Sequence, residues 1–143
     1  MSALVDVNVL LPIALSQHSL RNAAVDWWDR APDSSVVLCL PVRMAVLRLL
    51  TNRTVMGDDV LQPESAWAVW AKFCADDRTL ERYDTPDGLD MFWFQNVTGR
   101  DPSPKLWTDA WLAAFAECAG YEMVTFDRGF RSFSITDLHL LEA

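Results

Sequence analysis

The chain has few of the residues from which several common kinds of active site are built. Its 143 residues include only two histidines, His18 and His139, which lie far apart in the sequence. Neither has a partner at a spacing typical of metal ligands. A histidine-centred zinc site and a serine–histidine–aspartate triad are therefore not expected.

Cysteines are also few and isolated. Cys39, Cys74 and Cys118 form no Cys-x-x-Cys pair, and each has apolar neighbours in the sequence. An odd number of widely spaced cysteines argues against a disulfide framework and against a zinc site. We expect three buried, free thiols in a protein of a reducing compartment.

Glycine-rich phosphate-binding loops are missing too. The five glycines form neither a G-x-x-x-x-G-K-[ST] nor a G-x-G-x-x-G motif, so the usual nucleotide cradles are excluded. The segment Asp6-Val7-Asn8 lacks the second aspartate of phosphatases that use an Asp-x-Asp nucleophile. No nucleophile is paired with a base, which counts against a small-molecule α/β hydrolase.

Positive charge is scarce. Twelve lysines and arginines face 20 aspartates and glutamates, which gives a net charge of −8. Proteins that bind nucleic acid through bulk electrostatics usually carry the opposite charge. Either the partner is not a polyanion, or some carboxylates hold divalent cations that reverse the local sign of the charge.

The length and the hydrophobic content are those of one globular domain over residues 1–143. Hydrophobic residues make up 51% of the chain, which is too many for a disordered protein. No apolar run approaches the roughly 18 residues of a membrane span. The apolar segment Val9–Leu15 lacks a basic leader, so we expect neither a secretion signal nor a membrane anchor. The sequence thus predicts a soluble, cytoplasmic protein.

Short apolar runs alternate with segments of helical periodicity. Strands are predicted at Ala3–Asp6, Ser35–Leu40, Thr79–Tyr83, Tyr121–Phe126 and Ile135–Leu141. Helices are predicted at Val9–Ala14 with Pro12 in the first turn, at His18–Arg30, from Pro41 onward, and at Pro63–Cys74, Leu89–Val97 and Leu106–Cys118. Thr54–Asp59 is predicted to be a loop. This order predicts an α/β fold, with a mostly parallel sheet covered by helices on both faces.

Three aspartates occupy positions where a site would form in such a fold. Asp6 follows the first strand and Asp127 the fourth, while Asp109 begins the helix before that fourth strand. Ligands of open parallel sheets bind beyond the carboxyl ends of the strands, at the switch point of the strand order. Each aspartate also has a structural explanation, as a helix cap for Asp6 and Asp127 or as a favourable charge at a helix start for Asp109.

Three carboxylates brought together repel one another unless a cation or protons intervene. Oxygen ligands of this kind suit Mg²⁺ or Mn²⁺. The sequence therefore predicts a divalent-cation site formed by Asp6, Asp109 and Asp127 if the first and fourth strands are neighbours.

Several motifs resemble those of one family. The sequence resembles the PIN-domain ribonucleases, and among them the VapC toxins of bacterial toxin–antitoxin pairs, in the following segments in order: 4–10 (LVDVNVL), His18 and 24–27, 48–52 (RLLTN), 55–57 (VMG), 103–110 (SPKLWTDA) and 124–130 (VTFDRGF). These segments extend over nearly the whole chain, and the 103–110 segment is the most specific. The resemblance implies a PIN-like, three-layer α/β/α domain.

The resemblance also implies a metal-dependent endoribonuclease that a cognate, VapB-like antitoxin neutralises, and a homodimer. In such an enzyme Asp6, Asp109 and Asp127 hold Mg²⁺ or Mn²⁺ and are the catalytic residues. Further candidates are Asn8 and Thr125, as hydrogen-bond donors that orient the carboxylates, and Arg48 and Arg128, which either contact phosphate or form salt bridges.

One position departs from the family pattern. Many PIN nucleases carry a glutamate where this chain has Ala45, which weakens a second metal site. Asp84, Asp87 or Asp90 is a candidate to supply the missing carboxylate. The alternative function is a PIN-like module that binds its partner without efficient cleavage.

Tryptophan is abundant, with seven in the chain. Most of them stand at helical spacing, which favours core or interface packing over base stacking. We expect Trp27, Trp28, Trp67 and Trp70 to form a partly exposed groove that a segment of the antitoxin fills.

Overall fold

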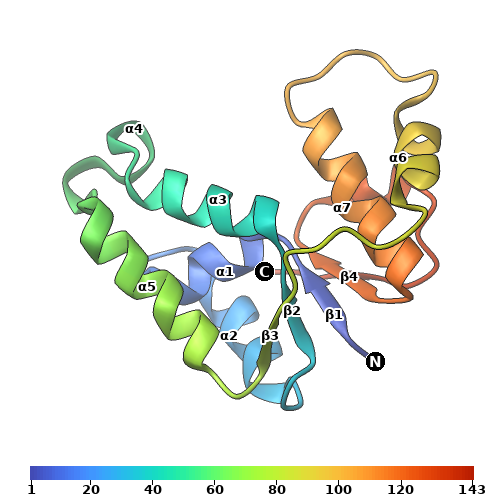
Figure 1. The fold of residues 1–143 in the computed structure, drawn as a ribbon. Helices are drawn as coiled ribbons and strands as arrows, with labels where there is room; N and C mark the ends of the chain where they lie inside the picture. Colours follow the sequence, from blue (N-terminus) through green and yellow to red (C-terminus); the bar gives the residue numbers. More distant parts are fainter.

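A computed structural model describes all residues from Met1 to Ala143 and has a five-stranded sheet at its centre (Figure 1). All neighbouring strands pair in parallel, in the order β3-β2-β1-β4-β5. The strands are β1 (Ala3–Val5), β2 (Val36–Leu38), β3 (Thr79–Glu81), β4 (Glu122–Thr125) and β5 (Leu138–Leu140). The predicted α/β class and the predicted parallel sheet are confirmed, although the strands are shorter than expected.

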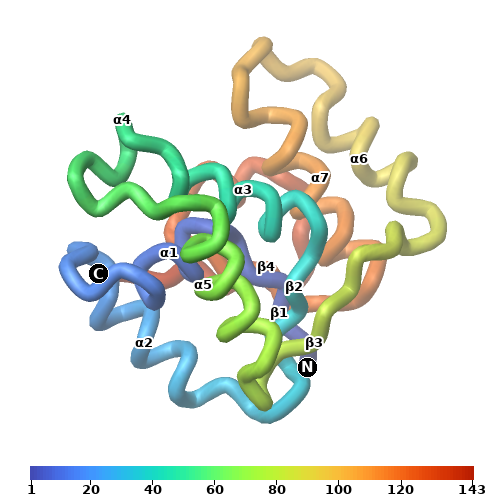
Figure 2. Tube along the Cα trace, turned by 60° about the vertical axis from the view of Figure 1, so that its left-hand side comes forward, coloured from blue at the N-terminus to red at the C-terminus, as the bar shows by residue number.

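Helices cover both faces of the sheet. One face carries α1 (Val7–Ala14), α2 (Arg21–Arg30), α3 (Leu40–Leu50) and α5 (Pro63–Ala75), and the other carries α6 (Leu89–Val97) and α7 (Leu106–Ala119) (Figure 1). In Figure 2 the yellow α6 lies beyond the orange α7 and far from the green α5. The chain steps from β1 to β2 to β3 in one direction and then crosses back to β4. Right-handed crossovers therefore put the two sets of helices on opposite faces.

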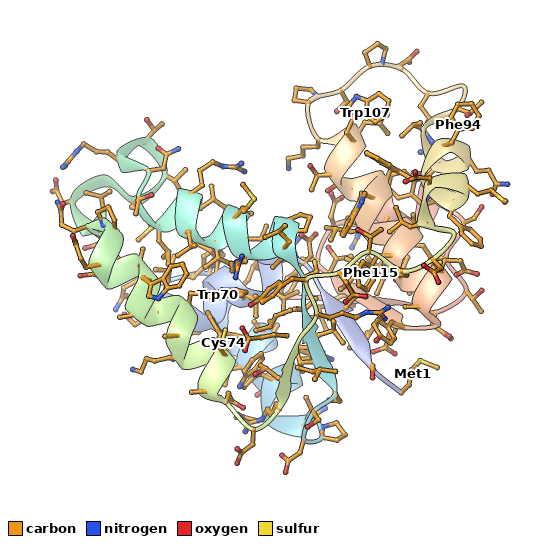
Figure 3. All side chains as sticks on the ribbon, in the orientation of Figure 1. Met1, Trp70, Cys74, Phe94, Trp107 and Phe115 are labelled. Atoms are coloured by element: carbon orange, nitrogen blue, oxygen red, sulfur yellow. The ribbon has the colours of Figure 1, made fainter.

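The core lies on both sides of the central strands. Every residue of β1 and β2 is buried, as are three of the four residues of β4. Strands covered on both faces have no polar side to present, which explains why these runs are continuously apolar. Phe115 of α7 and Phe130 are among the largest fully buried side chains, and Phe115 lies between α7 and the sheet in Figure 3.

Two element boundaries differ from expectation on the α1 side of the sheet. Helix α1 starts at Val7, directly after Asp6, so Pro12 lies inside the helix and not in its first turn. Arg21 donates hydrogen bonds to the carbonyl oxygens of Pro12 and Ile13 and so supplies donors at the end of α1. Helix α2 begins at Arg21 and not at His18.

The segment predicted as the loop Thr54–Asp59 is helical. It contains α4 (Arg53–Met56) and the 3₁₀ helix η1 (Gly57–Asp59). The side chain of Asn52 accepts hydrogen bonds from the backbone N–H groups of Thr54 and Val55 and thereby caps α4. A single turn is too short to show helical periodicity in the sequence, so only this cap was available as a signal. A second 3₁₀ helix, η2 (Arg128–Ser132), follows β4.

The predicted tryptophan groove is wrong. Trp28 and Trp70 are buried, and Trp28 packs edge-on against Phe73 of α5. Trp67 is 57% exposed, while Trp27 is half-buried. The four side chains line three different hollows, with Trp27 in one, Trp28 in a second and Trp67 with Trp70 in a third, so they form no shared groove.

The cysteine prediction is correct in part. All three cysteines are free, but only Cys39 is buried, whereas Cys74 and Cys118 are half-buried. Burial raises the pKa of the Cys39 thiol to about 12, which keeps it protonated and unreactive. None of the helices has the length and apolarity needed to cross a membrane.

Candidate active site

The switch point of the sheet lies between β1 and β4, which meets the condition on which the predicted cation site depends. β1 pairs with β2 on one side and with β4 on the other, and Val5 is in register with Val124. The next residue, Asp6, is tied to this edge because its backbone N–H donates to the carbonyl of Val124 at 3.0 Å. Asp6 and Asp127 thus leave the carboxyl ends of two adjacent strands.

Asp6 is a buried carboxylate with two hydrogen bonds. It is 6% exposed. Its Oδ1 accepts from the backbone N–H of Val7 at 2.7 Å and caps α1, while its Oδ2 accepts from the hydroxyl of Thr125 at 2.9 Å. Burial raises the pKa of Asp6 against the opposing effect of these two hydrogen bonds. Asp6 therefore both caps α1 and contributes a carboxylate to the site.

Thr125 and Asn8 form a network behind Asp6. The fully buried Thr125 hydroxyl accepts from the Asn8 side-chain amide at 3.0 Å and from the backbone N–H of Asp127 at 3.0 Å. The Asn8 carbonyl in turn accepts from the backbone N–H of Phe126 at 3.2 Å. These bonds connect the start of α1 to the end of β4. They hold the two carboxylate-bearing segments in one register.

Asp109 approaches the same edge from α7, in the first turn of the helix. It is half-buried, and the pKa of its carboxyl is raised to about 6. Burial is the main cause, and the negative charges of Asp6 and Asp127 add to it, while Lys105 acts in the opposite direction. Because the charges of Asp6 and Asp127 act on Asp109, the structure brings the three predicted carboxylates into one electrostatic cluster.

Asp127 is also a cap. Its side chain accepts from the backbone N–H of Gly129 at 2.8 Å at the start of η2. A Cβ on Gly129 would lie 3.0 Å from Oδ1 of Asp127, so this turn accepts a larger residue only if the carboxylate moves. The turn therefore fixes the Asp127 carboxylate on the same side of the sheet as Asp6.

A cleft of about 610 Å³ joins these residues, between α3 and α4 on one side and the start of α7 on the other. Its ionisable lining residues are Asp6, His18, Arg48, Lys105, Asp109 and Asp127. No three acidic, histidine or cysteine side chains are arranged closely enough to enclose a metal ion. Their donor chemistry nevertheless fits Mg²⁺ or Mn²⁺, since Mg²⁺ usually binds one or two carboxylates and keeps several waters.

The two candidate arginines differ in position. Arg48 lines the cleft from α3 and takes part in none of the four ion pairs of the structure. Arg128 is exposed in η2, is not among the residues that line the cleft, and has no ion pair either. Arg48, but not Arg128, therefore lies in the same cleft as the carboxylates.

Ala45 faces the cleft from α3, one turn before Arg48. The position of the expected family glutamate is thus in the site, but it carries a methyl group. None of Asp84, Asp87 and Asp90 lines the cleft. The carbonyl of Asp87 accepts from Cys118, which lies nine residues after Asp109 and so about 13 Å along α7 at ~1.5 Å per residue. These three aspartates lie toward the opposite end of α7 and do not replace the missing acid.

Two ionisable lining residues were not predicted as part of the site. Lys105 lowers the pKa of both Asp6 and Asp109, and its position four residues before Asp109 was a usable signal. His18 lines the cleft from the α1–α2 connection. Nothing in its sequence neighbours indicated this, because its position depends on how the connection folds.

The PIN domain family model matches residues 3–135 of the chain. Ribonuclease VapC41 from two strains of Mycobacterium tuberculosis, CDC 1551/Oshkosh and H37Rv, is 40% identical to the chain over 142 residues. The alignments cover 96% of this chain and 97% of each relative.

Solved structures have the same fold at lower identity. The VapBC2 complex of Rickettsia felis bound to promoter DNA matches with a TM-score of 0.70 at 11% identity, over 99% of this chain and 100% of the other. VapC20 of Mycobacterium tuberculosis, a toxin that cleaves the sarcin–ricin loop, matches with a TM-score of 0.69 at 17% identity and the same coverage. Such identities establish the fold and nothing finer.

Proposed function

The chain belongs to the PIN-domain family and, within it, to the VapC ribonucleases, and from this premise we propose that it is an endoribonuclease toxin that uses Mg²⁺ or Mn²⁺. The observation that carries the metal dependence is the cluster of Asp6, Asp109 and Asp127 at the switch point. Without a cation, three carboxylates with only one nearby lysine repel one another. A bound divalent cation offsets this repulsion, and carboxylates are suitable ligands for it.

In this proposal one or two of the carboxylates of Asp6, Asp109 and Asp127 bind the ion directly, and the remainder contact it through water. A bound divalent cation supplies an acidified water and neutralises charge that develops on the phosphoryl oxygens. Thr125 donates to Asp6 and Asn8 donates to Thr125, so both keep the carboxylates in their binding orientation.

Two cationic side chains in the cleft act on the substrate. Arg48 and Lys105 attract the phosphodiester and offset the repulsion between RNA and a protein of charge −8. We leave Arg128 out of this role, because it does not line the cleft.

Cleavage of a single-stranded RNA by the purified chain tests the proposal. We expect cleavage with Mn²⁺, none with EDTA, and a loss of at least about a hundredfold in Asp6→Asn, as is usual when a group that stabilises the transition state is removed. Asp33→Asn is the matched control, because Asp33 is exposed in the α2–β2 connection. RNA cleavage that persists in EDTA would exclude the metal-dependent mechanism.

A PIN-like module that binds without efficient cleavage is the second candidate, and Ala45 favours it. An alanine faces the cleft where many relatives have an acid. Stoichiometric RNA binding in Mn²⁺ with no cleavage over hours, in a protein that melts cooperatively, would establish this alternative.

We also propose a VapB-like antitoxin partner and a cytoplasmic location, where RNA is available. The similarity to VapBC complexes and the acidic cleft support the partner, since an arginine or lysine of a basic segment can compete with the metal there. Co-purification with the product of the adjacent gene, followed by an RNase assay at increasing Mn²⁺, tests this. Binding without loss of cleavage would contradict the antitoxin role.

A homodimer is the last part of the proposal. Met44 of α3 and Trp67 of α5 are 59% and 57% exposed on helices that pack against each other, and we propose that they contribute to the dimer contact. Sedimentation of the wild type and of Trp67→Glu decides it. We expect a dimer for the former and a monomer for the latter, and a monomeric wild type would refute the proposal.

A further inference from the structure

The 3₁₀ helix η2 and the α6–α7 connection carry a group of arginines outside the cleft. Arg128 and Arg131 are exposed side chains of η2. Arg100 belongs to the connection and docks on the same helix, because its guanidinium donates to the hydroxyl and the carbonyl of Ser132. We call Arg100, Arg128 and Arg131 the η2 basic surface. It gathers three of the 12 lysines and arginines of a chain whose net charge is −8.

The geometry of η2 directs its two arginines to the same side. Residues i and i+3 of a 3₁₀ helix eclipse each other, so Arg128 and Arg131 lie roughly 6 Å apart along the helix at ~2.0 Å per residue. Phe130 points in another direction, is fully buried and packs against Phe133 with 5.6 Å between the ring centroids. The apolar side of η2 therefore anchors it to the core, and the side with Arg128 and Arg131 faces solvent.

No acidic side chain neutralises this surface. The four ion pairs of the protein involve none of its three arginines. The carboxylate of Asp127 is bonded to η2, but it accepts from the backbone N–H of Gly129. Asp101 follows Arg100 in the sequence and pairs with none of the three either. Like charges on one face of a helix repel, and a bound anion would remove that repulsion.

The surface adjoins the cleft through two segments of the chain. Arg128 directly follows Asp127, which lines the cleft. The connection that Arg100 attaches to η2 ends at Pro104 and Lys105, and both of these residues line the cleft at the start of α7. A polymer that occupies the carboxylate end of the cleft can therefore extend onto η2.

We propose that the η2 basic surface binds the RNA backbone outside the cleft, through phosphates that flank the cleaved one. Guanidinium groups suit this role, because they bind two phosphate oxygens at once. The inference rests on the proposed function, and it makes the preferred substrate an RNA that extends beyond the cleft. Contacts to phosphates carry no sequence information, so the surface adds affinity for any sufficiently long strand.

The charge of the surface favours RNA over the proposed protein partner. A partner that closes the carboxylate cleft brings positive charge to it, and such a basic segment is repelled by the η2 basic surface. An RNA strand meets the proposed cation in the cleft and then the arginines of η2. Its negative charge is therefore matched at both places.

Binding of RNA without cleavage tests the surface. The Asp6→Asn variant, which the proposed function expects not to cleave, is titrated in Mg²⁺ with labelled oligouridylates of about 20 and about four nucleotides at several salt concentrations. The readout is fluorescence anisotropy. Each contact to a phosphate of a single strand contributes about 0.7 to the slope of log Kd against log[salt].

The added double substitution Arg128→Ala/Arg131→Ala removes two such contacts. We expect it to lower the slope for the long oligouridylate by about 1.4 and to weaken its binding at least about fivefold at low salt. Binding of the short oligouridylate should stay unchanged, because it fills only the cleft. An unchanged slope for the long oligouridylate would overturn the inference.

Arg30→Ala/Lys72→Ala is the matched control. It removes the same charge from two exposed side chains of α2 and α5 that form no ion pair and do not line the cleft. We expect it to change the Kd of the long oligouridylate less than twofold. An equal loss of affinity in both double variants would assign the effect to net charge and refute the surface.

Thermal melting shows that the test variant is folded. The side-chain bonds that hold η2 come from Arg100, Asp127 and Ser132, which the double substitution leaves in place. Both double variants should therefore melt at the temperature of their Asp6→Asn parent.

The remaining outcomes separate this inference from the proposed function. If the wild type cleaves no RNA but the long oligouridylate binds with the expected slopes, the proposed function fails and the surface stands. If the wild type cleaves RNA and Arg128→Ala/Arg131→Ala binds the long oligouridylate as its parent does, the surface is refuted and the nuclease activity stands. If the double variant binds RNA normally and no longer co-purifies with the protein partner, the surface docks a protein and the inference is wrong.

Discussion

Burial and the negative charges of Asp6 and Asp127 oppose the ionisation of Asp109. No hydrogen bond stabilises its charged form. Asp6 is buried too, but it accepts hydrogen bonds from Val7 and Thr125 that lower its pKa against the effect of burial. The consequence is a raised pKa of about 6 for Asp109. Without metal, this group disfavours the folded state wherever it is ionised in the unfolded chain.

The first prediction concerns this group in the absence of metal. The folded pKa of about 6 exceeds the ordinary aspartate value of 3.8, so stability falls as pH rises from about 4 through 6 and stays low above that. Asp109→Asn removes the charge. We expect it to raise the free energy of unfolding by about 1 kcal/mol at pH 7, after discounting for the exposed part of the group.

Urea denaturation in EDTA at pH 7 and pH 4.5 measures this effect. The increase in the free energy of unfolding that Asp109→Asn causes should be smaller at pH 4.5 than at pH 7. Asp90→Asn is the matched control, since Asp90 stands in the first turn of α6 as Asp109 does in α7. If the two substitutions change the free energy of unfolding equally, Asp109 acts only as a charge at a helix start, and the other carboxylates do not destabilise it.

The second prediction concerns Thr125. Thr125→Val keeps the shape but removes the hydroxyl that donates to Asp6 and accepts from the backbone N–H of Asp127. Buried groups left without a partner cost about 1–3 kcal/mol, so we expect a loss of about 2 kcal/mol in the free energy of unfolding. Thr125→Ser keeps the hydroxyl and should lose about 1 kcal/mol, from one methyl group. A valine variant more stable than the serine variant would contradict this account.

At the scale of elements, the single turn α4 supplies Val55 and Met56 to the cleft. It is held by the Asn52 side chain, which accepts from the N–H groups of Thr54 at 2.9 Å and Val55 at 3.4 Å. So short a helix has little stability of its own. Its cap therefore decides whether this wall of the cleft is ordered.

The third prediction tests this cap. Asn52→Ala is expected to lower stability by about 1 kcal/mol and to speed hydrogen exchange at the amides of Thr54 and Val55. Asn52→Asp keeps a cap acceptor and should stay close to the wild type in both measurements. If the alanine and aspartate variants exchange alike, the cap does not order α4.

How far the sequence predicts these elements depends on their length and burial. The strands β1, β2 and β4 were predicted because they are buried on both faces and read as continuous apolar runs. Helix α7 was predicted from its long periodic run and from Gly120, which has a φ of 71° and ends it. The turn α4 was not predicted, because a helix of four residues is too short to show helical periodicity in the sequence.

The site was predictable for a different reason. Asp6 and Asp127 follow adjacent parallel strands, so topology alone brings them together. The positions of His18 and Lys105 depend on the fold of connections, which sequence patterns do not specify. The tryptophan groove was predicted wrongly, because helical spacing does not reveal which face of α2 meets α5.

At the scale of the whole molecule, the net charge of −8 opposes RNA binding, yet the family acts on RNA. The proposed divalent cation at the carboxylates of Asp6, Asp109 and Asp127 would resolve this conflict, because it reverses the charge of the cleft. A cation that binds only the folded state must also stabilise the protein.

Thermal unfolding as a function of Mn²⁺ tests that claim most directly, with Asp109→Asn and the control Asp90→Asn beside the wild type. At free Mn²⁺ of about one hundred times Kd the stabilisation is about 2.7 kcal/mol, or roughly 10 °C in Tm. The account predicts this rise in the wild type and in Asp90→Asn and almost none in Asp109→Asn. An equal rise in all three proteins, or none in the wild type, would contradict it.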